Sequence, residues 1–201
     1  MPMLDHAFIH PLLGTDGAWS CYLVEFAPDA PGHDLLVNLD TSPLIDEFDH
    51  RSLWFFPADV AGSDLRQLGE RAIPVFASSA APNNTAALDQ QESELRKAKR
   101  KLGLLASAGH KLPGAGCWDY LLIAASHARS LAPYTLIGLA SRTTVISIEV
   151  QTHSDREWAL NHACSLSTSE FLQVRSTVQT SADITRLKLL KLLALIVEDA
   201  E

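Results

Sequence analysis

Apolar residues occur in short runs along the chain, and the first two runs predict a β-hairpin. Residues 8–13 form a short apolar run, residues 19–27 are rich in aromatic and β-branched residues, and Gly-Thr-Asp-Gly at 14–17 separates them. The run Leu-Leu-Val-Asn-Leu at 35–39 is typical of a short buried strand. Residues 52–57 fit either a strand or a packed loop, and the pattern favours neither.

Helices and strands alternate through the rest of the chain. The longest predicted helix covers 86–108, where leucines fall on one face, and Gly109 ends it. The strand predicted at 72–78 contains Pro74, which is typical of an irregular or edge strand. The other predicted elements are helices at 42–48, 64–71, 118–131, 155–164 and 183–197, strands at 111–116, 144–150 and 171–174, and an apolar run at 134–140. This alternation favours an α/β fold with a largely parallel sheet, open or closed.

The helix predicted at 155–164 carries two local signals. Ser154 is its expected N-cap, and Glu157 follows three residues later, as in a capping box. His153 and His162 are about two and a half helical turns apart, which places them on opposite faces. No metal shared by these two histidines is therefore expected.

The composition supports one domain with a core of its own. Hydrophobic residues make up 47% of the 201 residues, which excludes wholesale disorder. The net charge of −8 argues against a nucleic-acid partner, because binding to phosphates needs a basic face. The sequence shows no secretion signal and no apolar run of the roughly 18 residues that a membrane span needs. We therefore expect a cytoplasmic protein with no membrane partner.

The three cysteines, Cys21, Cys117 and Cys164, are far apart and form no Cys-x-x-Cys pair. Such a dispersed, odd set is typical of apolar side chains in a reducing compartment, and not of a disulfide framework or a zinc site. We expect no metal and no cofactor.

Basic residues gather at the end of the longest predicted helix. They are Arg96, Lys97, Lys99, Arg100 and Lys101. The favoured interpretation is a solvated helix face, partly paired with Glu92 and Glu94. A docking patch for an acidic partner is the alternative.

The predicted strands carry few groups that could do chemistry. In a β/α barrel, catalytic carboxylates are expected at the carboxyl ends of the strands. Apart from the two aspartates that flank the run at 35–39, only Glu25, Glu149 and Glu170 fall in or beside predicted strands, and no Gly-rich phosphate loop or nucleophile motif is present. The sequence therefore predicts no catalytic residues.

Several stretches nevertheless resemble EAL domains, the cyclic di-GMP phosphodiesterases. The hairpin with Tyr-Leu-Val-Glu-Phe-Ala at 22–27 resembles the opening of that family and its Glu-Ala-Leu signature, and 35–39 resembles its next strand, Phe-Ile-Asn. Residues 146–173 are similar to the family's Ala-Glu-Lys-Val-Glu-Thr stretch, especially in proteins that join an EAL domain to an HDOD domain. Residues 185–200 are similar to the helix between those two domains. The likeness covers nearly the whole chain, although no motif is intact.

The resemblance implies a nucleotide and metal site of which little is kept. Glu25 matches the glutamate of the signature, and Asn38 stands in a metal-ligand place. Asp29 replaces the arginine that the family uses on the nucleotide phosphate. The family's paired aspartates align with Ala115 and Gly116. Glu25 and Asn38 are thus vestigial positions, too few to hold a divalent cation that prefers six oxygen ligands.

The resemblance also has consequences for the second half of the barrel. The lysine and aspartate of the family's Lys-Ile-Asp strand fall at Leu136 and Gly138, within the run 134–140. Too few residues then remain before the strand at 144–150 for a crossover helix. Either the barrel is incomplete there, or the strands lie elsewhere in the sequence.

We therefore expect a degenerate, incomplete TIM-like (β/α) barrel of EAL type over residues 1–180, with an N-terminal hairpin. Residues 181–201 are expected to form an apolar helix that packs in the core, in a dimer or against another domain. The expected function is a non-catalytic signalling module of bacterial regulation that acts through protein–protein contacts, including self-association through this helix. The alternatives are a receptor that binds cyclic di-GMP without hydrolysis and, last, an active phosphodiesterase.

Overall fold

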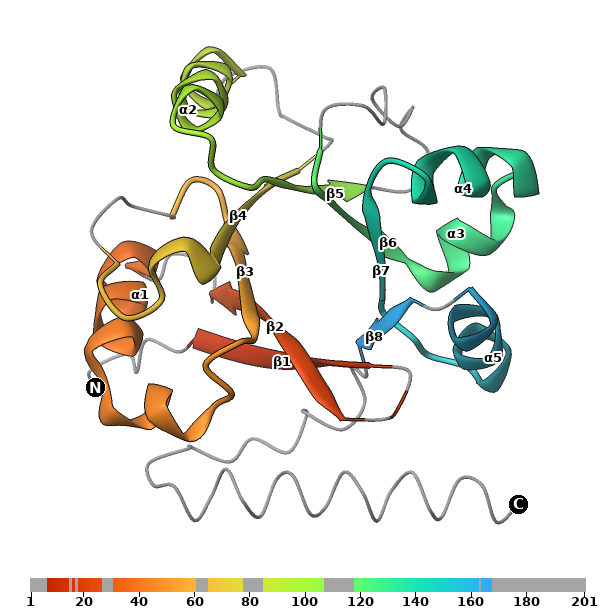
Figure 1. Cartoon of the computed structure of the whole chain (residues 1–201), viewed down its shortest axis with the longest axis horizontal. Helices are drawn as coiled ribbons and strands as arrows, with labels where there is room; N and C mark the ends of the chain where they lie inside the picture. Colours follow the sequence, from red (N-terminus) through yellow and green to blue (C-terminus); the bar gives the residue numbers. More distant parts are fainter. Residues whose placement is uncertain are drawn as a thin grey trace, which may run out of the picture.

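The computed structural model describes residues 7–14, 16, 18–26, 31–60, 65–77, 85–106, 118–162 and 164–167. Within these residues, eight strands pair in chain order, and the last pairs with the first, so that the sheet closes into a barrel (Figure 1). The strands are β1 Ala7–Leu13, β2 Trp19–Phe26, β3 Leu53–Pro57, β4 Ala72–Ala77, β5 Gly103–Ala106, β6 Tyr120–Ala124, β7 Thr144–Ile148 and β8 Ser165–Ser167. The predicted α/β class with a largely parallel sheet is confirmed.

The barrel departs from a regular TIM barrel in two ways. Strand β1 runs antiparallel to both β2 and β8, whereas β2 to β8 are parallel to one another. The helices outside the sheet are uneven, since in the described residues the connection from β3 to β4 holds only the short 3₁₀ helix η2 Gly69–Arg71. The other helices are α1 Gly32–Thr41, η1 Pro43–Glu47, α2 Thr85–Lys97, α3 Ala125–Ser130, α4 Pro133–Ala140 and α5 His153–Asn161. The fold is thus TIM-like but incomplete.

Side chains of the strands alternate between the barrel interior and the helices outside. The interior holds buried apolar residues from both halves of the sheet, among them Leu12, Cys21, Phe55, Ile73, Val75, Tyr120, Leu122, Ile146 and Ile148. Outside the sheet, the rings of Tyr22 and Trp54 lie 4.5 Å apart in a second cluster that includes Leu36 of α1. This alternation decides which side chains can reach the end of the barrel.

The hairpin predicted at the start of the chain is confirmed, but the strand predicted at 35–39 is wrong. These residues belong to α1, whose buried positions recur every four residues at Gly32, Leu36 and Asp40. The Asp40 carboxylate accepts hydrogen bonds from the backbone N–H groups of Arg66, Gln67 and Leu68, and so joins α1 to the segment before η2. A run of four apolar residues cannot by itself distinguish a strand from one face of a helix.

The helix predicted over 86–108 is too long. Helix α2 ends at Lys97, and Lys99 follows with a φ of +55°. The N–H of Lys99 donates to the carbonyl of Arg96 and that of Arg100 to the carbonyl of Leu95, which together form a Schellman end. The apolar residues after this turn form β5 instead. Because lysine occupies the left-handed position that glycine usually fills, the sequence gives no stop signal there.

The helix predicted at 118–131 is also wrong in its first half. Residues 120–124 form β6, and α3 begins at the very next residue. The run 134–140 is the helix α4, with Pro133 in its first turn, and it connects β6 to β7. The strand that the resemblance assigned to this run therefore lies earlier in the sequence, which leaves room for the crossover.

The remaining predictions have mixed outcomes. Residues 52–57 contain the strand β3, and the strands expected at 72–78 and 144–150 are present as β4 and β7. Pro74 is not at an edge, because β4 pairs with β3 and β5 on either side. The helix expected at 42–48 is the 3₁₀ helix η1. In the helix expected at 64–71, only the last three residues are helical among those described, as the 3₁₀ helix η2.

The N-cap of helix α5 lies two residues before the predicted one. Thr152 is the N-cap, and its side chain and that of Asp155 each accept a hydrogen bond from the other residue's backbone N–H. Ser154 and Glu157 therefore do not cap this helix. The elements predicted at 111–116, 171–174 and 183–197 lie outside the described residues. In the part of the chain that is described, no helix is long and apolar enough to cross a membrane.

Candidate functional site

The carboxyl ends of the parallel strands β2 to β8 meet at one rim of the barrel, where a TIM-like fold carries its chemistry. Strand β1 is antiparallel, so its first residues lie at the same rim, with Phe8 paired to Glu25 and His10 to Leu23. Cys21 and Leu23 of β2 face the barrel interior. Because side chains alternate along a strand, Glu25 follows them on the inner side, at the end of β2.

Glu25 pairs with a neighbouring histidine at this rim. The Nε2 atom of His10 lies 3.2 Å from a carboxylate oxygen of Glu25, and the Glu25 side chain is 60% exposed. His10 holds the pKa of Glu25 below its usual value, although partial burial acts in the opposite direction. The carboxylate therefore stays charged and already has a partner within the barrel.

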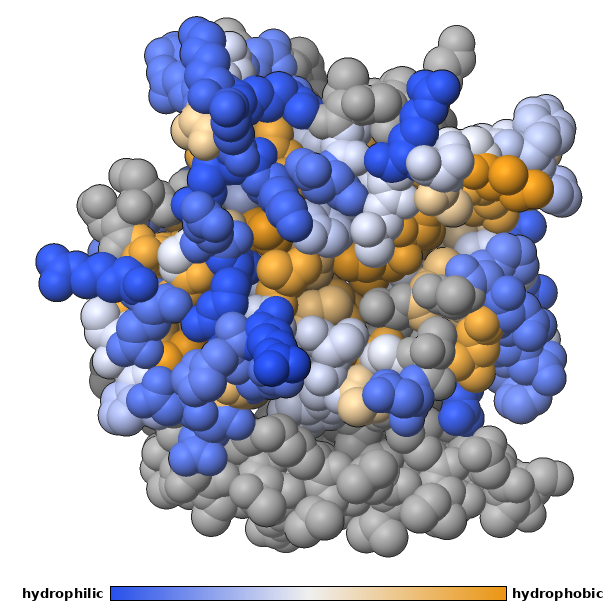
Figure 2. Space-filling view, in the orientation of Figure 1, coloured by the Kyte–Doolittle hydropathy of each residue, from blue (hydrophilic) through white to orange (hydrophobic). Residues whose placement is uncertain are grey.

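The inner-facing ends of strands β3 to β7 are apolar. The last inner-facing residues of strands β3 to β7 are, in order, Pro57, Ala77, Leu105, Ala124 and Ile148. Figure 2 shows orange side chains gathered in the region that the strands enclose in Figure 1. Among the described inner-facing strand residues from β2 to β7, Glu25 is thus the one carboxylate at the rim.

The segments that follow β4 and β5 contain no acidic residues. Residues 78–84 and 107–117 contain neither aspartate nor glutamate. Within the described parts of the chain, no three histidine, cysteine or acidic side chains come together as a metal site would require. The described residues thus do not form the oxygen-rich set that a Mg²⁺ or Mn²⁺ ion needs.

The structure separates the two vestigial positions. Glu25 lies at the rim, as the resemblance implies, whereas Asn38 is an exposed residue of the outer helix α1 and not a strand residue. Its assignment to a ligand place depended on the predicted strand at 35–39, which is absent. Sequence reasoning also missed His10. The signal that could have found it is its position in the hairpin, two residues before the interior residue Leu12 and on the strand that pairs with β2.

Glu149 directly follows β7 and is exposed, with a φ of +53°. This left-handed backbone is uncommon for a residue with a side chain. Ile148 before it faces the interior and is the last residue of β7, so the regular alternation of the strand ends before Glu149. Glu170, the third acidic residue noted in the sequence, lies outside the described residues.

The buried carboxylates of the described chain have structural partners. Asp155 accepts a hydrogen bond of 2.7 Å from Arg129 and caps α5, and these contacts lower its pKa. Asp40 accepts backbone N–H groups, as described above. Cys164 is buried, and burial raises the pKa of its thiol, which disfavours a reactive thiolate.

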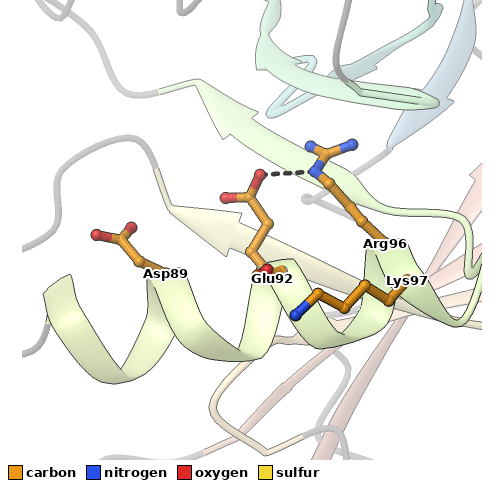
Figure 3. Close-up of a pocket in the computed structure, with 5 residues that line it drawn as sticks. Asp89, Glu92, Arg96 and Lys97 are labelled. Carbon is orange, nitrogen blue, oxygen red and sulfur yellow. Dashed lines mark hydrogen bonds and ion pairs between the residues drawn. The ribbon is translucent and has the colours of Figure 1, made fainter.

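The basic cluster borders a shallow hollow on α2 (Figure 3). Its lining comes from one helix face: Asp89, Glu92, Ser93, Arg96 and Lys97. Arg96 pairs with Glu92 at 2.8 Å and its guanidinium lies 5.0 Å from the ring centroid of Trp118. The predicted pairing with Glu92 is confirmed, whereas Glu94 accepts a hydrogen bond from Gln90.

Arg100 of the same cluster serves the fold. Its guanidinium donates to the carbonyls of Gly69 and Ala72, at the start of β4. The cluster is thus divided between a solvated helix face and a structural contact. These contacts do not converge on a ligand.

No protein-family model matches the sequence, and no curated protein matches it either. Among solved structures, the EAL-like domain protein YdiV is similar to this chain, with a TM-score of 0.60. The two share 10% sequence identity over 81% of this chain and 89% of that one. At this identity the likeness shows the fold alone: the barrel is EAL-like.

Proposed function

We propose that this chain is a non-catalytic EAL-like signalling module that acts through protein–protein contacts in bacterial regulation. The observation that supports this most is the apolar rim, where Glu25 is the one inner-facing carboxylate of the described strands β2 to β7. Hydrolysis of a phosphodiester on such a scaffold needs divalent ions to activate water and to neutralise the phosphate. A single carboxylate, already paired with His10, does not supply the ligands for them.

The sequence at the phosphate-binding position supports the same proposal. Asp29 stands where EAL domains have arginine. A carboxylate there would repel the two phosphates of cyclic di-GMP. Without carboxylate ligands for divalent metal ions and without the arginine that binds phosphate, both catalysis and nucleotide binding are disfavoured.

A nucleotide assay tests this proposal. We expect no hydrolysis of cyclic di-GMP above the protein-free rate with Mn²⁺ or Mg²⁺. Turnover that Glu25→Ala abolishes and Glu157→Ala, at an exposed position of the outer helix α5, preserves would contradict the proposal. The matched alanine variant separates a true site at the rim from a contaminating hydrolase.

Calorimetry with cyclic di-GMP tests the second function, that of a receptor without hydrolysis. Binding tighter than roughly 10 μM, or about −7 kcal/mol, would establish the receptor over the interaction module. We expect no saturable heat. Weak heat that is unchanged in Glu25→Ala would not come from the rim.

Self-association through residues 183–197 stays a prediction, because these residues lie outside the described chain. Their leucines make the segment apolar nearly all round, which favours a buried position. Light scattering coupled to size exclusion tests it: a dimer that Leu193→Lys converts to a folded monomer would support the interface, and a monomeric wild type would exclude it.

A further inference from the structure

We draw no further inference here: the strongest candidate, the exposed face of helix α4 that carries Tyr134 and Ile137, is an apolar surface patch, and nothing in the described part of the structure shows what covers it.

Discussion

Single residues decide the chemistry at the rim of this barrel. Glu25 lies at the rim and its partner there is His10, and the described inner-facing residues of β2 to β7 add no further carboxylate. A carboxylate paired in this way is a local stabilising contact. Its exposure keeps this contribution small, since screened ion pairs contribute little.

The pairing predicts the titration of Glu25. Because His10 lowers the pKa of Glu25 in the folded protein, its contribution to stability is present above the usual pKa and is lost as pH falls through the lowered value. Carbon-detected NMR of the side-chain carboxyl should give a pKa below 4.5 for Glu25. His10→Ala should raise it. A Glu25 pKa that does not move in this variant would show that the contact is absent in solution.

Backbone conformation at one residue gives a second prediction. Lys99 has a left-handed backbone at the end of α2, where glycine is favoured. Lys99→Gly should therefore increase the free energy of unfolding by about 0.5–1 kcal/mol in urea titrations. Lys97→Gly, two residues earlier and within the helix, should decrease it by about 1 kcal/mol. Equal effects of the two substitutions would contradict the assigned end of α2.

At the scale of elements, the sequence pattern predicted some strands and included β5 and β6 in predicted helices. The hairpin and β7 have β-branched residues and turn signals, and both were predicted correctly. Strand β6 passes directly into α3 at Ala124 and Ala125 without a turn residue, so 118–131 reads as one helix. The run at 35–39 is ambiguous for another reason: it is too short to show whether its apolar residues repeat with the period of a strand or of a helix.

The candidate site follows from these element errors. The position of Glu25 on a strand was predicted correctly because the hairpin was, and its role in a nucleotide or metal site stays a prediction. Asn38 was placed wrongly because the helix α1 was predicted as a strand. His10 was missed because its importance comes from strand pairing with β2, which one residue's local sequence does not reveal.

The start of α5 offers a test between the predicted and the observed cap. Thr152 accepts a hydrogen bond from the N–H of Asp155, whereas Ser154 lies inside the helix. Thr152→Ala should lower the free energy of unfolding by about 1 kcal/mol, and Ser154→Ala should change it by less than about 0.5 kcal/mol. The reverse order in urea titrations would favour the cap predicted from the sequence.

Asp155 adds a pH dependence to the same element. The hydrogen bond from Arg129 lowers its pKa below the usual 3.8, so its stabilisation is complete above that value and is lost as pH falls through the lowered pKa. Wild-type stability should therefore decrease in this acidic range. Asp155→Asn should be less stable at neutral pH by about 2 kcal/mol and should lack this part of the acid dependence. A variant that keeps the wild-type pH profile would contradict the role of this carboxylate.

At the scale of the whole molecule, an EAL-like barrel is kept while its rim is apolar. The fold is shown by the closed sheet and by the likeness to YdiV.

Crystals soaked in Mn²⁺ test the central claim most directly, because anomalous scattering locates manganese without relying on activity. The account predicts no ordered ion at the carboxyl ends of the strands. A well-occupied manganese ion there, held by Glu25 and further protein oxygens, would contradict it. Soaked crystals of Glu25→Ala provide the matched control.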